Sequence, residues 1–565
     1  MCDVNNIRDP IQSTLVPDDI DYLLATGALI LPTISLEKAL LHAYVNYVHP
    51  SMPLLDLHHF LVVLDRRNSS LGHISLLLYQ AVMFAATAFV DGEALHEAGY
   101  PIRKKARKDY FQKARLLYEF DYDLLLMTYW QEAPNEQKDM WHWLGLQHDP
   151  SNMGLPIREQ NLRKRIWWCC VMRDRLIALG MRLSTQIGNE EFDVRMLQES
   201  DFEFATSPED NVTIPAEYTY LLDTARQQEL AALCISKAQL CIHIGSMLLA
   251  QYSLLRPNQA QAEATADINM RLYPRHLSDD WKSFQLVDAA LLLWFRSLPL
   301  ACQYRPLHSL TAKDGMGVVA VHRTLLHMLY HATTAALHRP RLLRVSSTHA
   351  PMMSSQTQEQ SRLRARDAAL HITQMAVELC ASDLDKYLPN AGVAVVMLAM
   401  AISLLEIKNH DQRVHDQGRS CFYTCLHILD RLRQIHPSAD WATTFFKAAL
   451  GKVEIDMETR LGTMIQRNHQ SFGSVVNPIL QVRADERPVN IIPTSKTHPA
   501  VFHESMVPNM LAPQPAKDLA LDTEVTALHT AQVYEETGSL GLEVFEYGDI
   551  DWGVFMSLEL DSYSQ

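Results

Sequence analysis

Apolar residues recur at intervals of three and four along most of this chain. That period places them on one face of an α-helix, whereas a half-buried strand would alternate apolar and polar residues. One such face opens after Ser35, a candidate N-cap, and ends at His49-Pro50. Another ends at Gly180, where a glycine would suit a left-handed helix end. The pattern predicts an all-α, multi-helix domain over residues 35–470, preceded by an N-terminal spacer at 1–34.

The chain after this domain has a different composition. Seven of the 26 prolines lie between Pro478 and Pro515, which predicts a Pro-rich linker over residues 471–517. From Asp518 to Gln565 there are eleven acidic residues and no lysine or arginine. The rest of the chain is nearly neutral, so most of the net charge of −15 belongs to this end. We expect residues 518–565 to form a weakly ordered acidic tail.

Within the tail, aromatic residues alternate with carboxylates from Val544 to Met556. Such a segment buries too little apolar surface to fold by itself, and charge repulsion keeps its aromatic rings accessible. Acidic activation segments bind partner grooves in this way. The alternative is an incidental acidic terminus. We interpret the tail as an activation segment whose contacts come from Phe545, Tyr547, Trp552 and Phe555.

A basic run stands out in the first quarter of the chain. Its charged members are Arg103, Lys104, Lys105, Arg107 and Lys108. The run is typical of a nuclear import patch, which would place the protein in the nucleus. It is also typical of the solvated face of a helix that continues into Tyr110. The sequence leaves both interpretations open.

No complete catalytic motif is present, so we expect no enzyme. Asp18-Asp19-Ile20-Asp21 and Asp279-Asp280 resemble magnesium-binding motifs of isoprenoid enzymes, which keeps an all-α, Mg-dependent isoprenoid enzyme as an alternative function. In each motif, one position that should hold an acidic metal ligand holds another residue instead. These residues are Tyr22 in the first motif and Val287 in the second. Acidic residues at a helix N-terminus explain the same pattern.

No metal or cofactor is expected either. His327 and His331 are four residues apart, but no third ligand has supporting spacing, and they are interpreted as core histidines. The nine cysteines form no C-x-x-C pair, which predicts reduced thiols of an intracellular protein. The apolar runs Ile74–Val90 and Ala391–Leu405 are too polar or too short to span a membrane, so no membrane contact is expected.

Three blocks in order resemble the regulatory domain of the fungal zinc-cluster transcription factors, especially those similar to cutinase transcription factor. The first block runs from Asp18 to Phe60 and contains His49-Pro50, and the third contains His338-Arg339-Pro340. The central block contains Trp167-Trp168 and Asp174. We hypothesise that Asp174 is partly buried beside a tryptophan and paired with an arginine, Arg182 being one candidate, because an unpaired buried carboxylate is costly.

The resemblance implies a transcriptional regulator of a metabolic or secondary-metabolite pathway. It would act through protein contacts, with the transcription machinery or a DNA-binding partner, as a homodimer or heterodimer. A metabolite-sensing helical domain is a further alternative. Members of the family usually begin with six cysteines that hold two zinc ions, whereas only Cys2 precedes residue 169 here. We therefore expect no direct DNA binding from this chain alone, unless a truncated gene model has removed that module upstream of Met1.

Overall fold

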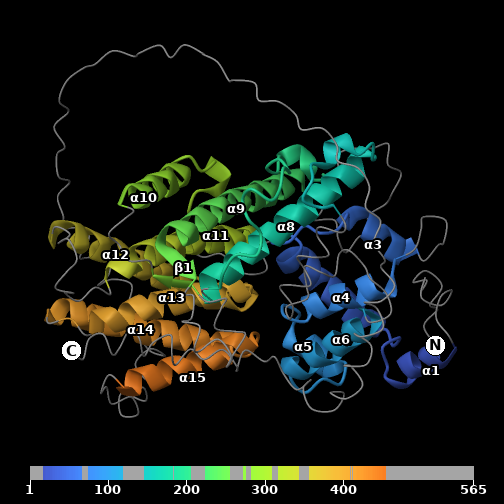
Figure 1. Cartoon of the computed structure of the whole chain (residues 1–565). Coiled ribbons are helices and arrows are strands. Elements are labelled where there is room, and N and C mark those ends of the chain that lie inside the picture. The colour runs from blue at the N-terminus through green and yellow to red at the C-terminus, as the bar shows by residue number, and fades with distance from the viewer. Residues whose placement is uncertain are drawn as a thin grey trace, which may run out of the picture. The chain divides into compact units, whose positions relative to one another are not determined.

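The computed structural model describes residues 17–66, 74–118, 145–181, 183–204, 223–254, 272–274, 281–307, 316–342, 355–407, 409 and 411–452. The predicted linker and acidic tail, with the four aromatic residues of the activation segment, lie outside these residues. The helices shown in Figure 1 are α1 (Pro17–Ala25), α2 (Ile34–Ala43), α3 (Leu57–Arg66), α4 (Leu76–Ala86), α5 (Gly92–Glu97), α6 (Arg103–Tyr118), α8 (Ile157–Met181), α9 (Thr224–Gln251), α10 (Trp281–Arg296), α11 (Met316–His338), α12 (Ser355–Ala381), α13 (Asn390–Ile407), α14 (Gln412–Leu432) and α15 (Pro437–Lys452).

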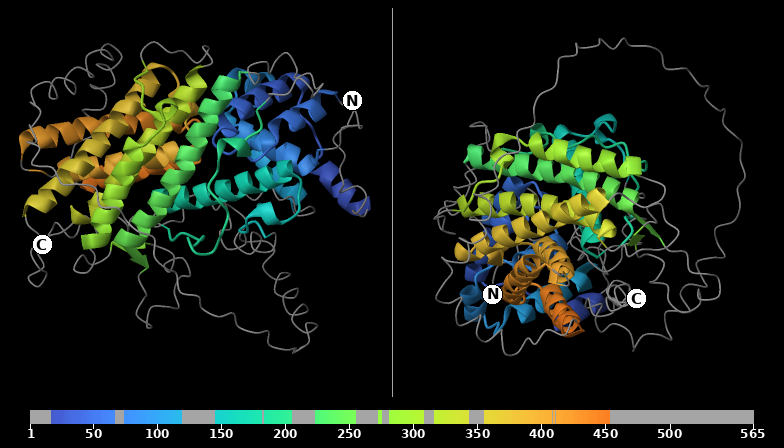
Figure 2. Two further views of the ribbon diagram at one scale, coloured as in Figure 1. Left: turned by 90° about the horizontal axis from the view of Figure 1, so that it is seen from above. Right: turned by 90° about the vertical axis from the view of Figure 1, so that its left-hand side faces the viewer.

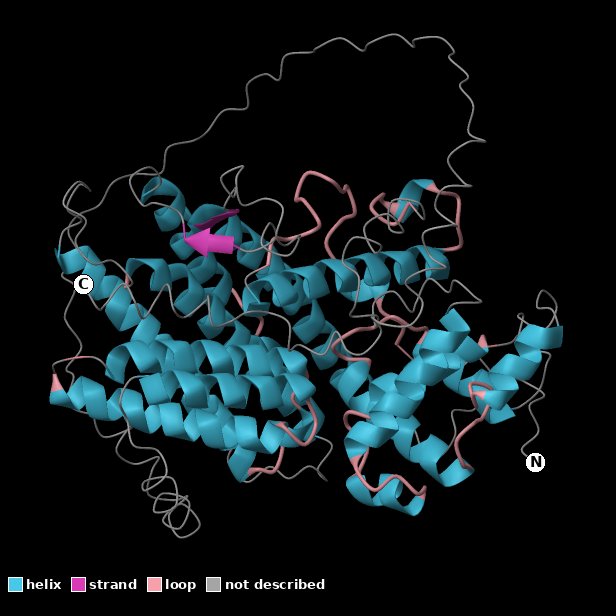
Figure 3. Ribbon diagram, turned by 60° about the horizontal axis from the view of Figure 1, so that its bottom comes forward, coloured by secondary structure: helices cyan, strands magenta, loops and turns pink. Residues whose placement is uncertain are grey.

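The prediction of an all-α domain is confirmed. In the described part of the chain, helices account for almost all regular structure, as the colouring of Figure 3 makes clear. The exception is one short antiparallel pair, β1 (Tyr252–Leu254) and β2 (Leu272–Pro274). The hydroxyl of Tyr252 donates to the carbonyl of Ala336 at 2.9 Å, which ties this pair to α11.

The long helices pack in sequence order. Helix α11 contacts α12, α12 contacts α13, and α13 contacts α14, so consecutive helices are neighbours in space (Figure 2). Helix α13 is apolar on all sides and lies between α8, α11 and α14. Among the described residues, α9 and α13 are long and apolar enough to cross a membrane, yet 61% and 72% of their apolar windows are buried inside the protein. Burial to this extent is typical of core helices.

The shorter N-terminal helices share a second apolar cluster. It contains residues assigned above to the spacer, since Leu23 and Ala28 are fully buried in it. The side-chain amide of Gln80 donates to the carbonyls of Ala28 and Ile30, which fixes this segment against α4. The helical body therefore begins before residue 35, and the expected boundary of the spacer is too late.

Contacts far apart in sequence join the N-terminal helices to the long ones. Tyr47 stacks on Tyr387 with ring centroids 3.8 Å apart. Ser51 is held from two sides: its carbonyl accepts from Lys237 Nζ at 2.6 Å, and its hydroxyl lies 3.3 Å from His322 Nδ1. The described residues of both groups thus belong to one packed unit.

Two predicted helix ends differ from the structure. The first helix of the domain is capped by Thr33, whose hydroxyl accepts from the N–H of Leu36, and not by Ser35. Gly180 does not end its helix: α8 runs through it to Met181. A Cβ atom on Gly180 would lie 2.8 Å from the Cβ of Ala394, so this glycine permits close approach of α13. Helix α11 ends at His338, as expected for a helix followed closely by Pro340.

Candidate functional site

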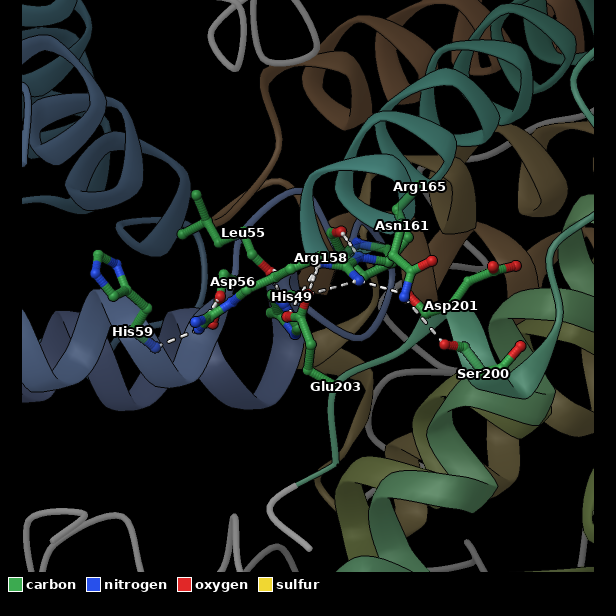
Figure 4. A network of polar contacts seen from close by, with 11 residues as sticks. His49, Leu55, Asp56, His59, Arg158, Asn161, Arg165, Ser200, Asp201 and Glu203 are labelled. Carbon is green, nitrogen blue, oxygen red and sulfur yellow. Dashed lines mark hydrogen bonds and ion pairs between the residues drawn. The ribbon is translucent and has the colours of Figure 1, made fainter. Parts of the chain in front are cut away.

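The central block of the resemblance is built around Arg165, in the middle of α8. Its side chain is only 2% exposed. The guanidinium donates to the carbonyls of Pro53, at 3.1 Å, and Leu55, at 3.4 Å. It also donates to the carbonyl of Asp201 and pairs with both carboxylate oxygens of Glu203 at 3.2 Å (Figure 4). One arginine therefore fastens three chain segments together.

The first block lies beside this arginine. The π-helical turn Tyr44–Val48 ends directly before His49-Pro50, as the proline predicts. His49 Nε2 lies 3.2 Å from the carbonyl of Leu55, which Arg165 also contacts. Burial lowers the pKa of His49 to about 4, since the carbonyl contact and Asp56 only partly offset the burial and the charge of Arg165. The imidazole is therefore neutral near pH 7, and its contact with Leu55 positions the chain at this turn.

The segment after α8 is packed more closely than predicted. The acids and turn formers between Phe192 and Pro215 predict a weakly ordered surface loop there. Instead, Phe192 contacts Trp167 and Trp168, with ring centroids 5.3 and 5.9 Å apart. Trp168 Nε1 donates to the carbonyl of Arg195 at 2.7 Å, and Leu197 is buried. For the described residues 192–204, the expectation is wrong, because the two tryptophans provide a surface for the segment.

Asp174 has a side chain only 7% exposed and is paired with an arginine, as hypothesised, whereas its position beside a tryptophan stays a prediction. Its partner is the adjacent Arg175, whereas Arg182 lies outside the described residues. The carboxylate also accepts from the backbone N–H of Gln186, at 2.8 Å, and of Ile187, at 3.4 Å. Burial raises the pKa of Asp174 and outweighs the opposing effects of Arg175 and the two N–H donors.

Arg175 carries the other half of this arrangement. Its side chain is 1% exposed and donates to the carbonyl of Ile187 and to Asn189 Oδ1. Space for it is provided by Gly245 of α9, where a Cβ atom would lie 2.7 Å from Arg175 Nε. The pair fixes the turn after α8 against the helix, which is a structural role.

The third block borders a pocket of about 420 Å³ between α10, the end of α11 and α12. His338 is buried there, 3.5 Å from Asp288, which pairs with Arg364 at 2.7 Å. Burial lowers the pKa of His338 despite Asp288. Arg339 and Pro340 form the buried turn that follows. The histidines of the first and third blocks thus lie in different places. His49 lies beside the polar network of Arg165, and His338 lines the pocket.

Comparison with known proteins decides the family. A family model described as fungal specific transcription factor domain matches residues 41–295. Cutinase transcription factor 1 beta of Fusarium vanettenii is 47% identical over 492 residues, which cover 83% of this chain and 56% of that protein. The chain belongs, through residues 41–295, to the family of fungal specific transcription factor domains. No solved structure matches it.

Other relatives of this regulatory domain are more distant. A transcription factor of Fusarium pseudograminearum (strain CS3096) is 33% identical, over 77% of this chain and 50% of that protein. Transcription factor cpaR of Aspergillus oryzae is 28% identical, over 76% of this chain and 73% of that protein. The chain spans about half the length of the first two relatives.

In the regulatory domain, the basic run forms the start of α6. Arg103 donates to the carbonyls of Thr87, Ala88 and Val90 and so closes the end of α4. Arg107 lies over the ring of Phe84 at 5.3 Å, and Lys104 pairs with Asp440. The two remaining cations, Lys105 and Lys108, are exposed. Packing thus accounts for three of the five cations, and nuclear import through the patch stays a prediction.

The residues considered for metal binding have other surroundings. Asp18 and Asp19 lie in the first turn of α1, where carboxylates complement the positive end of the helix dipole. Asp279 and Asp280 lie outside the described residues. The interpretation of His327 as a core histidine is confirmed: it is 3% exposed, with Nε2 2.8 Å from the carbonyl of Cys302. Within the described ranges, no group of three or more potential ligands could hold a metal ion.

Proposed function

We propose that this chain is a transcriptional regulator of a metabolic or secondary-metabolite pathway and acts in the nucleus through protein contacts. The observation that carries the proposal is the 47% identity to cutinase transcription factor 1 beta over 83% of this chain. Two relatives, cutinase transcription factor 1 beta and transcription factor cpaR, are named as transcription factors. The helical domain would hold the regulatory function, and its partners would be the transcription machinery or a DNA-binding protein, which includes a second copy of this chain.

Activation is assigned to the acidic tail. Eleven carboxylates without a compensating cation would steer the segment toward a basic surface, and the aromatic side chains would fill an apolar groove there. The residues proposed to make these contacts are Phe545, Tyr547, Trp552 and Phe555.

Fusion of residues 518–565 to an unrelated DNA-binding domain tests this assignment. We expect reporter transcription well above that of the DNA-binding domain alone, and loss of most of it when Trp552 and Phe555 are both replaced by alanine. A matched control replaces Leu519 and Leu521, which lie outside the aromatic segment. A silent wild-type fusion would remove the activation proposal.

A second function, metabolite sensing, is favoured by the pocket at His338. Its lining combines an aromatic ring, Phe284, with the partly exposed Arg364, whose guanidinium has donors beyond those used by Asp288. Such a site suits a small organic acid with an apolar body. Thermal unfolding of the full chain with octanoate or octanol as the probe tests it. A rise in Tm with octanoate alone, abolished by Arg364→Gln, is expected, and no shift in wild type would exclude this class of ligand.

A further inference from the structure

Helix α10 exposes large apolar side chains in a row. Leu286 and Leu293 are 70% and 69% exposed, and Ala289 between them is exposed as well. These residues are three and four positions apart, so they are neighbours on the helix surface. The opposite side of the helix contains the buried Leu291 and Trp294, which pack into the domain. In most folded proteins exposed leucines are scattered singly, whereas these form a stripe of the kind that a partner covers.

The ends of this stripe are basic. Lys282 and Arg296 flank it, and both are exposed. The helix contains one acidic residue, Asp288, whose carboxylate pairs with Arg364 of α12. We call the surface made by the three stripe residues and the two flanking cations the α10 face. Two α10 faces in contact would bring like charges together, so the partner that fits this face is acidic and apolar.

Helix α1 carries a surface of that character. Asp21 and Tyr22 follow Asp18 by three and four residues, so the three side chains are neighbours, and all of them are exposed. Leu24, which is 55% exposed, borders the same side of the helix, whereas Leu23 on the opposite side is fully buried in the N-terminal cluster. We call the surface made by Asp18, Asp21, Tyr22 and Leu24 the α1 face.

The two faces match in charge and length. Within the described ranges, none of their four charged side chains, at Asp18, Asp21, Lys282 and Arg296, forms an ion pair. Helix α1 has 9 residues and is about 13 Å long, and the stretch of α10 between its two cations measures about 21 Å, so α1 fits between them. Figure 1 shows α1 and α10 at opposite ends of the described helices, so a second copy has to supply the contact.

We propose that this chain forms a dimer in which the α1 face of each copy binds the α10 face of the other. The apolar side chains of α1 cover the leucine stripe, and its carboxylates pair with the flanking cations. One contact between two helices is small, whereas stable interfaces bury about 1,200–2,000 Å² in total, so two contacts related by a two-fold axis are favoured. The inference rests on the proposed function, in which a second copy is one of the protein partners.

Exchange of the charges on the two faces tests the dimer. The α1 swap is Asp18→Lys/Asp21→Lys, and the α10 swap is Lys282→Glu/Arg296→Glu. Sedimentation equilibrium of the full chain at micromolar concentration should show a dimer for wild type. Each swap alone should raise the Kd of the dimer by about a hundredfold, because like charges then face each other at both contacts.

The two swaps should also restore each other. An equimolar mixture of the two swapped proteins should form a dimer again, and so should one chain that carries all four substitutions, because each contact then joins opposite charges. A monomeric wild type, a dimer that the α1 swap leaves intact, or a four-substitution chain that stays monomeric would overturn the proposal. A dimer held by two α10 faces would be recognised by its indifference to the α1 swap.

A matched control changes the charge of exposed cations elsewhere. Lys105→Glu/Lys108→Glu on α6 alters two exposed positions and should leave the Kd within about twofold of wild type. All substituted positions are exposed except that their backbone stays helical, and equal far-UV circular dichroism of the variants shows that the fold is retained.

Photocrosslinking maps the contact. Tyr22 is replaced by p-benzoylphenylalanine, isotope-labelled and unlabelled full chains are mixed and irradiated, and the crosslinked peptides are identified by mass spectrometry. We expect crosslinks from Tyr22 of one copy to α10 of the other. Crosslinks between copies that map only to other helices would contradict the proposed interface.

A reporter assay separates this inference from the function on which it rests. Residues 518–565, fused to an unrelated DNA-binding domain, test activation without the helical domain. If this fusion activates but the full chain is a monomer, the dimer is wrong and the activation function stands. If the fusion is silent while the swapped chains restore each other, the dimer stands and the activation function fails.

Discussion

Replacement of Asp174 by asparagine tests how much the domain depends on its central buried ion pair. Asp174→Asn keeps the size of the side chain but removes the charge that faces Arg175. The arginine side chain is 1% exposed, so its guanidinium would remain buried with the carbonyl of Ile187 and Asn189 Oδ1 as its other acceptors. Removing one partner of a buried pair typically costs about 3–5 kcal/mol. We expect a loss of this size in the free energy of unfolding.

Urea denaturation followed by circular dichroism measures this loss. Asp367→Asn is the matched control, because Asp367 is 61% exposed and its contact with His371 is solvated; a change within about 0.5 kcal/mol is expected there. The double variant Asp174→Asn/Arg175→Met removes both charges and should recover part of the stability. A free energy of unfolding of Asp174→Asn within about 1 kcal/mol of wild type would refute the reasoning.

Three further perturbations follow from the same contacts. Gly180→Ala should destabilise the domain by about 1–3 kcal/mol in urea denaturation, because the new Cβ meets Ala394 at 2.8 Å. Burial lowers the pKa of His322 and His436 to about 4 in the folded protein. As the pH falls below 6.5, these histidines are therefore protonated in the unfolded chain but still neutral in the folded protein. Stability should therefore fall between pH 6.5 and 4, by about 2 kcal/mol for each histidine at pH 5. Arg165→Lys should cost about 2–5 kcal/mol, since lysine cannot bridge the same carbonyls and carboxylate.

Each of these three has its own control. Gly92→Ala should be nearly neutral, as no atom lies within 4 Å of its new Cβ. Replacing both histidines by glutamine should make the pH dependence less steep without removing it, because burial also lowers the pKa of His49 and His338. An unchanged slope would show that other groups cause it. Arg163→Lys affects a partly exposed pair with Glu159, and a loss equal to that of Arg165→Lys would contradict the network.

Helix periodicity was sufficient to predict most of the long helices, because their apolar stripes are wide and regular. The apolar run Ala391–Leu405, for example, lies within α13 at Asn390–Ile407. Gly180 was misinterpreted because a glycine that ends a helix and one that allows two helices to approach look the same in one sequence. Only the position of Ala394, more than 200 residues later, distinguishes them.

The polar network at Arg165 had no sequence signal. Glu203 is 38 residues away, and the carbonyls of Pro53 and Leu55 precede the arginine by more than 100 residues. Arg103 poses a similar problem. Its place in a basic run suggests a solvated helix face or a nuclear import patch, yet its guanidinium donates to the carbonyl of Val90, after the end of α4. Backbone carbonyls are present at every residue, so the sequence does not show which of them an arginine will meet.

We propose that this protein regulates transcription through its acidic aromatic segment. RNA sequencing in the source organism tests it most directly, with the gene deleted and then restored either as wild type or with Phe545, Tyr547, Trp552 and Phe555 changed to alanine. We predict a defined set of transcripts that deletion lowers, that wild type restores and that the alanine variant, at equal protein level, leaves low. Unchanged transcripts on deletion, or full restoration by the alanine variant, would contradict the account.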